Sequence, residues 1–286
     1  MDLGIDMSYD ECKQAMINRL TELTEYSTSM LEQSAPDPRK LRSKPRYLSA
    51  LFPMSLSYTQ GIKLLTEKDQ PRNAIILLRS SQELWFNTFL IYSTRSDIWL
   101  WHTLLKDEVS NFKKATELHA DGHMSSEQLK TLSKQLDSLK NFVYRKYDSL
   151  PLVDGVITER SNGLDKHLSL KDKCRIIDRS NVRSPDGLFE KQYATVYSFF
   201  SETAHGTSRG MNSVYFQNED SLELDIYGTK GQKQSLLVIE TAYLYHYDLL
   251  KIYCDKIATK IKIPDSIKES RDTMKKYSKQ LANAKL

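Results

Sequence analysis

The sequence predicts an all-α protein, a multi-helix bundle, on three observations. The 286 residues include only 10 Gly and 8 Pro, so the turn signals that many short strands would need are scarce. Long segments carry apolar residues at steps of three and four, the period of a helix with one buried face. Hydrophobic residues make up 40% and charged residues 27%, a balance typical of a soluble globular chain rather than a disordered one.

The helices can be placed in order from their start and stop signals. The first is expected over Tyr9–Gln33, with Ser8 as N-cap and Glu11 completing a capping box. A loop with three prolines follows, over Ser34–Pro45. Pro71 suits the first turn of a helix, where its missing N–H is not needed. The remaining helices are expected over Leu48–Lys68, Asn73–Thr94, Ser96–His119, Ser125–Tyr147, Ser169–Ile177, Gly187–Ala204, Gln232–Ile263 and Ile267–Ala284.

One small β-hairpin is the expected exception, near residues 213–227. Its two segments are Ser213–Gln217 and Leu222–Tyr227, each short and rich in β-favouring residues. The helices then form one bundle domain over residues 1–262, followed by a basic C-terminal helix or tail over residues 263–286.

Several classes of protein are disfavoured. The longest uncharged stretch, Tyr47–Ile62, is too short and too polar to span a bilayer, and the acidic N-terminus does not resemble a secretory signal. The cysteines, Cys12, Cys174 and Cys254, lie far apart without a C-x-x-C pair, which favours a reducing cytoplasm. A cytoplasmic location without membrane contact is therefore expected.

Neither a metal nor a cofactor is expected. His119 and His123 have the spacing of a helical metal pair, but Gly122 between them is expected to end the helix, and no third ligand is evident. The chain also lacks a phosphate-cradling glycine loop and a dinucleotide fingerprint.

Two segments carry polar residues where apolar ones are expected. Arg79 and Glu83 lie four apart in the middle of an apolar helix, on one helical face. Farther along, Ser201, His205 and Arg209 share a four-residue spacing. Buried charge is costly unless it is paired, so the pattern predicts a polar cluster inside the helical core. An ion pair that fixes helix register, with His205 as a capping residue, remains the structural alternative.

A second candidate pair is Arg95 and His102, which fits the loose Arg-x4–6-His pattern of the higher-eukaryote–prokaryote nucleotide-binding (HEPN) ribonucleases. Arg160 and His167 fit it equally well, and with 14 Arg and 6 His in the chain about one such match is expected by chance. Arg95 and His102 are therefore a backup to the His205 cluster.

The net charge of +4 is unevenly spread, and basic clusters can neutralise phosphate. Two basic segments, in the proline-containing loop and in the C-terminal helix, are candidates for contact with nucleic acid, although a solvated surface is the alternative. Their residues are Arg39, Lys40, Arg42, Lys44, Arg46, Lys275 and Lys276.

The segments Leu77–Tyr92 and Tyr193–Arg209 resemble the bacterial family called domain of unknown function 5677. An R-S-x-x-E helix matches Arg79 and Glu83, and a later helix with a Tyr, Ser and His pattern matches Tyr197, Ser201 and His205. The resemblance covers roughly Ser49–Lys256. It implies a helical fold and leaves the activity open. At the level of fold alone, the chain is also similar to HEPN-type bundles and abortive-infection proteins.

Two functions of different classes follow as expectations. The first is a cytoplasmic bacterial defence or toxin-like protein that acts on RNA or a nucleotide; if it is an enzyme, it is a metal-independent HEPN-like ribonuclease. His205 would then be the acid–base group, Arg79 or Arg209 would stabilise phosphorane charge, and Glu83 would orient His205. The second is a non-enzymatic scaffold or sensor that binds a partner protein or nucleic acid through its basic segments. A homodimer fits the first function, with contributions from Trp85, Trp99 and Trp101.

Overall fold

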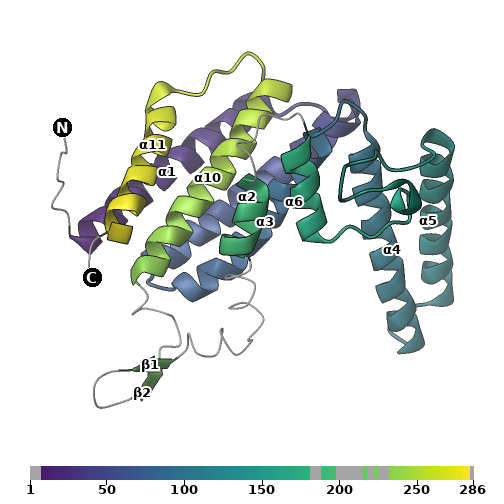
Figure 1. Ribbon diagram of the computed structural model, residues 1–286, viewed down its shortest axis with the longest axis horizontal. Coiled ribbons are helices and arrows are strands. Elements are labelled where there is room, and N and C mark those ends of the chain that lie inside the picture. The colour runs from purple at the N-terminus through teal and green to yellow at the C-terminus, as the bar shows by residue number, and fades with distance from the viewer. Residues whose placement is uncertain (1–7, 181–187, 198–214, 218–221, 225–231, 284–286) are drawn as a thin grey trace. The chain divides into compact units, whose positions relative to one another are not determined.

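The computed structural model describes residues 8–180, 188–197, 215–217, 222–224 and 232–283; for both strands and residues 232–234 and 275–283 it describes the backbone alone. The prediction of an all-α, multi-helix protein is confirmed (Figure 1). The chain divides into two compact units, Met1–Trp85 with Ala194–Leu286, and Phe86–Tyr193, where the sequence predicts one domain over residues 1–262. Helix α3, Pro71–Tyr92, contributes residues to both.

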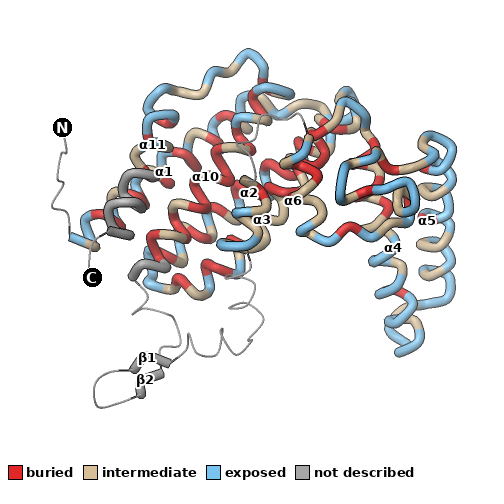
Figure 2. The backbone as a smooth tube through the Cα atoms, viewed as in Figure 1, coloured by how far each residue is buried: buried red, intermediate tan, exposed pale blue. Residues whose placement is uncertain are grey.

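The first unit is built on three long helices that pack against one another. They are α1 (Tyr9–Ser34), α2 (Ser43–Glu67) and α10 (Gln232–Lys256). Helix α11 (Asp265–Asn283) packs on both α1 and α10. Figure 2 shows buried positions following α10 along most of its length. Aromatic rings fill this core, and Phe52 stacks on Tyr253 with ring centroids 4.6 Å apart.

The helix starts follow local chemistry. Ser8 and Glu11 form the predicted capping box of α1, and Pro71 opens α3 as expected. The predicted loop over Ser34–Pro45 is shorter than expected, because it holds the 3-10 turn η1 (Pro38–Lys40) and α2 already begins at Ser43. Pro45 therefore lies in the first turn of α2, where a proline costs no intrahelical hydrogen bond.

The predicted hairpin is confirmed. Strand β1 (Tyr215–Gln217) pairs antiparallel with β2 (Leu222–Leu224), with Tyr215 opposite Leu224. The helix expected over Gly187–Ala204 differs: α7 covers only Leu188–Gln192, and a π-helical turn, η3, follows over Tyr193–Tyr197.

The second unit contains the end of α3, α4 (Ile98–Ala120), α5 (Ser126–Lys146), the 3-10 turn η2 (Glu159–Ser161), α6 (Leu170–Arg179) and α7. Helix α4 packs against α5, and α6 packs against α7. The ring of Phe189 from α7 lies 5.0 Å from Phe89. Gly122, at φ +76°, ends α4 as predicted.

None of the described helices combines the length and apolarity that crossing a bilayer requires. The three cysteine thiols are free and buried.

Candidate functional site

Arg79, Glu83 and Tyr197 form a polar cluster in the first unit. The Arg79 guanidinium Nε lies 3.4 Å from Glu83 Oε1 and donates to the Tyr197 hydroxyl at 3.3 Å. That hydroxyl in turn donates to Glu83 Oε1 at 2.9 Å. The guanidinium carbon also lies 5.5 Å from the centre of the Tyr197 ring, within the range of a cation–π contact. We call these three residues the Arg79 cluster.

The Arg79 cluster is only partly buried, whereas the sequence predicts a cluster inside the helical core. The Arg79 side chain is 24% exposed and that of Glu83 44%. Both lie on the side of α3 that reaches solvent, although their apolar neighbours Ile75 and Leu78 are fully buried. A ligand in solution can therefore reach a charged pair that is held in place by packing on the rest of the helix.

Two other residues of α3 anchor this helix to α10. Gln82 donates from its amide nitrogen to the Tyr245 hydroxyl, and the Trp85 indole donates to Asp248 Oδ2 at 3.1 Å. The Trp85 and Tyr245 rings lie 4.7 Å apart. These contacts fix the rotation of α3 about its axis and so determine where Arg79 and Glu83 emerge.

Tyr197 reaches the cluster from the end of the π-helical turn η3. Partial burial raises the pKa of the Tyr197 phenol, and the hydrogen bond to Glu83 raises it further, against a lowering by Arg79. The phenol is therefore protonated at neutral pH and can hold its proton toward Glu83. In the sequence, Tyr197 was indicated by the family pattern that also contains Ser201 and His205. Segments of π-helix are frequent at functional sites.

Ser201, His205 and Arg209 lie outside the described residues, so the part of the predicted cluster that they form stays a prediction. In the sequence they follow Tyr197 at steps of four, eight and twelve.

The backup pair Arg95 and His102 has an unfavourable geometry for catalysis. Arg95 is exposed before α4, whereas His102 is 2% exposed inside it. The His102 Nε2 atom lies 2.8 Å from the Lys166 carbonyl oxygen, and burial lowers the His102 pKa to about 4. A neutral imidazole that no solvent reaches does not suit an acid–base role.

Two arginines of the basic loop make contacts within their own segment. Arg39 pairs with Asp37 at 3.1 Å, and Arg46 donates to the Pro38 carbonyl oxygen at 2.8 Å. Lys44 is buried. The other four predicted nucleic-acid residues of this segment, Arg39, Lys40, Arg42 and Arg46, are exposed. The side chains of Lys275 and Lys276 in α11 lie outside the part of the chain that the structure describes.

The histidine pair near Gly122 does not form a metal site within the described residues, where no group of three or more His, Cys, Asp or Glu side chains is suitably placed. Helix α4 ends at Ala120, and His119 Nδ1 lies 2.8 Å from the Met124 carbonyl oxygen.

A second polar network, which sequence reasoning missed, is fully buried in the first unit. His246 on α10 has its two ring nitrogens 3.0 Å from the hydroxyls of Ser55 on α2 and Ser27 on α1. Its ring stacks on Phe52 at 5.2 Å, and burial lowers its pKa to about 3. Because this network is closed to solvent, it ties three helices together and does not present reactive groups to a ligand.

Fold and site together define an all-α helical protein with a half-exposed Arg–Glu–Tyr cluster. The model of the "Family of unknown function (DUF5677)" matches residues 46–223, more than half of the chain, and the chain belongs to that family. The match contains the whole Arg79 cluster but ends before α10, short of the expected limit near Lys256. No curated protein and no solved structure matches the chain.

Proposed function

We propose that the protein is a metal-independent ribonuclease of a bacterial defence or toxin type, and that the Arg79 cluster and His205 act together in it. The observation that supports the proposal is the Arg79 cluster itself: a cation, a carboxylate and a phenol, joined by one ion pair and two hydrogen bonds and partly exposed to solvent. Tyr197 joins this cluster and is also the residue from which the sequence continues to Ser201, His205 and Arg209.

The roles follow from the chemistry of RNA cleavage. His205 takes the proton of a ribose 2′-hydroxyl, the 2′-oxygen attacks phosphorus, and the bond from phosphorus to the 5′-oxygen breaks. The imidazolium then returns its proton to that 5′-oxygen, leaving a 2′,3′-cyclic phosphate and a 5′-hydroxyl. Arg79, or Arg209, stabilises the charge of the phosphorane. Glu83 orients His205, as a carboxylate does for a catalytic imidazole.

Because the Arg79 cluster is partly exposed, its residues can be replaced with less risk of unfolding the protein than residues of a buried cluster. Ion pairs at a protein surface contribute only about 0–1 kcal/mol to folding, and Arg79 and Glu83 are a quarter to nearly half exposed. We therefore expect Arg79→Ala to lower activity by at least about 100-fold, the typical effect of losing a transition-state stabiliser, while leaving the fold stable.

The experiment combines induced expression in a bacterial host with a purified assay on fluorescent RNA. Wild-type protein should degrade RNA to products with 2′,3′-cyclic phosphate ends, and His205→Ala should abolish cleavage. RNA carrying 2′-O-methyl groups should resist cleavage, because its ribose has no hydroxyl proton to remove.

His102→Ala is the matched histidine control, since it removes an imidazole outside the Arg79 cluster. Its RNA cleavage should persist wherever the variant remains folded by circular dichroism. Cleavage lost in His102→Ala but retained in His205→Ala would move the site to Arg95 and His102. Intact RNA with wild-type protein, in cells and in the purified assay, would contradict the proposal and favour a scaffold or sensor.

A further inference from the structure

Helix α5 carries a shallow groove along its outer side, in the second unit. The groove has a volume of about 560 Å³ and is lined by Ser138, Asn141, Phe142, Arg145 and Lys146. Figure 2 shows α5 exposed along most of its length, and only Leu136 and Val143 are buried among its residues. The helix packs on α4 and leaves this side to solvent.

The charge of the groove is positive. Arg145 and Lys146 line it, and no acidic residue does. Over its whole length α5 has five Lys or Arg residues against two acidic ones. Ser138, Asn141 and Arg145 follow each other at steps of three and four, so they share one helical face, and Lys134 extends that face by one turn.

An aromatic ring lies beside these cations. The Phe142 side chain remains 43% exposed, although one edge of its ring packs on Trp101 of α4, with ring centroids 4.6 Å apart. The Lys146 ammonium lies 5.6 Å from the centre of the Phe142 ring and 5.8 Å from that of Trp101. The ring is thus packed against α4 and partly open to solvent, with the Lys146 ammonium over it.

Basic residues in the last turn of a helix also interact favourably with the helix dipole. That role accounts for the positive charge of Arg145 and Lys146. It does not account for the exposed ring of Phe142 or for the amide of Asn141 on the same side. A rigid aromatic ring, a hydrogen-bonding amide and two cations are together the means by which proteins hold unpaired bases and the phosphates between them.

We propose that the α5 groove binds single-stranded nucleic acid, with an unpaired base stacked on Phe142 and phosphates at Arg145 and Lys146. The site goes beyond the proposed function, because it concerns binding in the second unit and would hold whether or not the protein cleaves RNA. A duplex is disfavoured as the ligand, since its bases are stacked on each other and present no free face to Phe142.

The experiment measures fluorescence anisotropy of labelled twelve-nucleotide strands with the full-length protein (site sizes for single strands run from about 4 to 16 nucleotides). The probes are a 2′-O-methyl RNA, which the proposed chemistry cannot cleave, the DNA strand of the same sequence, and the matching duplex. Arg145→Glu should weaken single-strand binding by about tenfold, and Phe142→Leu, which keeps an apolar contact with Trp101, by about fivefold or more.

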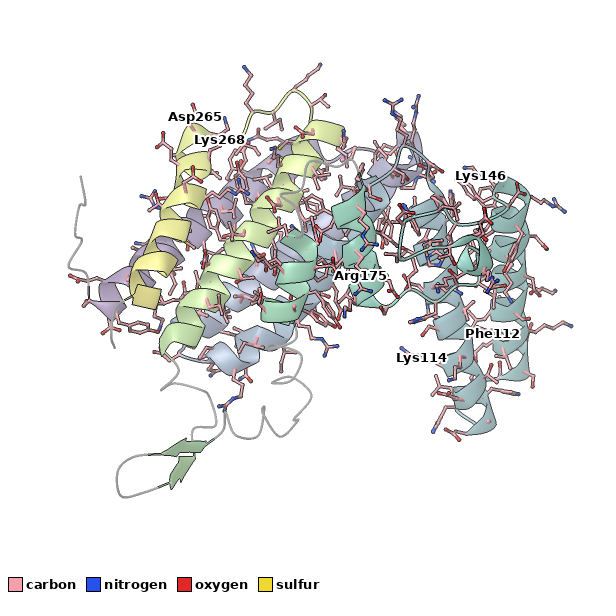
Figure 3. All side chains as sticks on the ribbon, in the orientation of Figure 1. Phe112, Lys114, Lys146, Arg175, Asp265 and Lys268 are labelled. Atoms are coloured by element: carbon pink, nitrogen blue, oxygen red, sulfur yellow. The ribbon has the colours of Figure 1, made fainter. Side chains whose placement is uncertain are left out.

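Lys114→Glu is the matched control for charge. Lys114 is exposed on α4, and Figure 3 shows it near the opposite end of the α4–α5 pair from Lys146. Its replacement should change affinity by no more than about twofold, because opposite ends of the pair lie farther apart than the Debye length of about 10 Å. Thermal unfolding of each variant reports whether the fold is retained.

Equal weakening by Arg145→Glu and Lys114→Glu would overturn the proposal, because diffuse charge would then explain binding. An unchanged affinity in folded Phe142→Leu, or binding of duplex as tight as that of single strands, would also overturn it. Equal affinity for the RNA and DNA strands supports recognition of base and phosphate alone, and preference for RNA adds a sugar contact. Wild-type protein that binds single strands through the groove but leaves unmodified RNA intact would reject only the proposed function.

Discussion

His246 couples the stability of the first unit to pH. Its ring is fully buried between Ser27 and Ser55, and burial lowers its pKa to about 3, against about 6.5 in an unfolded chain. Between these values the unfolded state binds a proton that the folded state does not, so stability rises with pH. The contribution is complete above pH 6.5 and declines as the pH falls toward 3, by about 1.4 kcal/mol per unit.

We expect urea unfolding to lose about 2 kcal/mol between pH 6.5 and pH 5 from this residue alone. His246→Gln should remove that dependence, whatever its stability at pH 7.5. His102, whose pKa is also lowered, remains in both proteins and cancels in the comparison. His123→Gln, at an exposed position, is the control for loss of an imidazole. Identical pH slopes in wild type and His246→Gln would contradict the assignment.

At the residue scale, the sequence could indicate which side chains share a helix face but not what they meet. The four-residue spacing of Arg79 and Glu83 correctly predicted one face and an ion pair. The contact with Tyr197 joins positions more than a hundred residues apart, and no local pattern encodes it. His246 was missed for the same reason, because its partners lie on two other helices and a lone histidine in an apolar helix carries no periodic signal.

At the element scale, local chemistry predicts the start and end of most helices. Ser8 with Glu11, Ser125 with Gln128 and Ser169 with Asp172 all form capping boxes, which depend on residues within one turn. The start of α2 was missed because three prolines read as a loop, although a proline is compatible with a first helical turn. The short α7 and the π-helical turn after it were not predictable, because apolar spacing does not distinguish turns of slightly different pitch.

The glycine that ends α4 is a local signal whose contribution to stability can be measured. Gly122 has φ +76°, and a Cβ added there would meet no atom within 4 Å. The Gly122 N–H donates to the His119 carbonyl oxygen and the His123 N–H to that of Leu118, the pattern of a left-handed helix cap. Gly122→Ala should therefore lower the free energy of unfolding by about 1 kcal/mol through backbone strain alone.

Gly163→Ala is the matched control, since Gly163 has equally open surroundings without a left-handed φ. In urea unfolding it should equal or exceed wild type, because alanine restricts the unfolded chain. Asn at position 122 should be tolerated better than Ala, since Asn adopts left-handed φ more readily. Equal effects of alanine at both glycines would show that φ at Gly122 does not limit stability.

At the scale of the whole molecule, the sequence shows two basic segments but not which of their side chains packing covers or local contacts engage. In the loop, Arg39 and Arg46 contact their own segment and Lys44 is buried. The sequence counts charges but cannot tell an exposed lysine from one that packing has covered. For that reason the α5 groove, which depends on the rotation of α5 against α4, could not be found from composition.

The C-terminal segment also differs between the sequence prediction and the structure, here in the domain to which it belongs. From the sequence, residues 263–286 are expected to form a basic C-terminal helix or tail outside the bundle domain. In the structure, Ile267, Ser270 and Met274 of α11 are buried, and the Tyr243 hydroxyl of α10 donates to the Ile267 carbonyl oxygen at 2.8 Å. Helix α11 is therefore part of the core of the first unit, and its removal would expose apolar surface and leave the buried Tyr243 hydroxyl without this acceptor.

Met274→Ala should lower the free energy of unfolding by about 2–5 kcal/mol, the usual cost of truncating a fully buried methionine. Glu269→Ala, at an exposed position of the same helix, should stay within about 0.5 kcal/mol of wild type. A chain ending at Pro264 should unfold at a lower temperature and bind a hydrophobic dye, whereas one ending at Asn283 should behave as wild type. If the shorter chain unfolds as the full-length protein does, α11 is a detachable arm, and its basic residues become candidates for partner binding again.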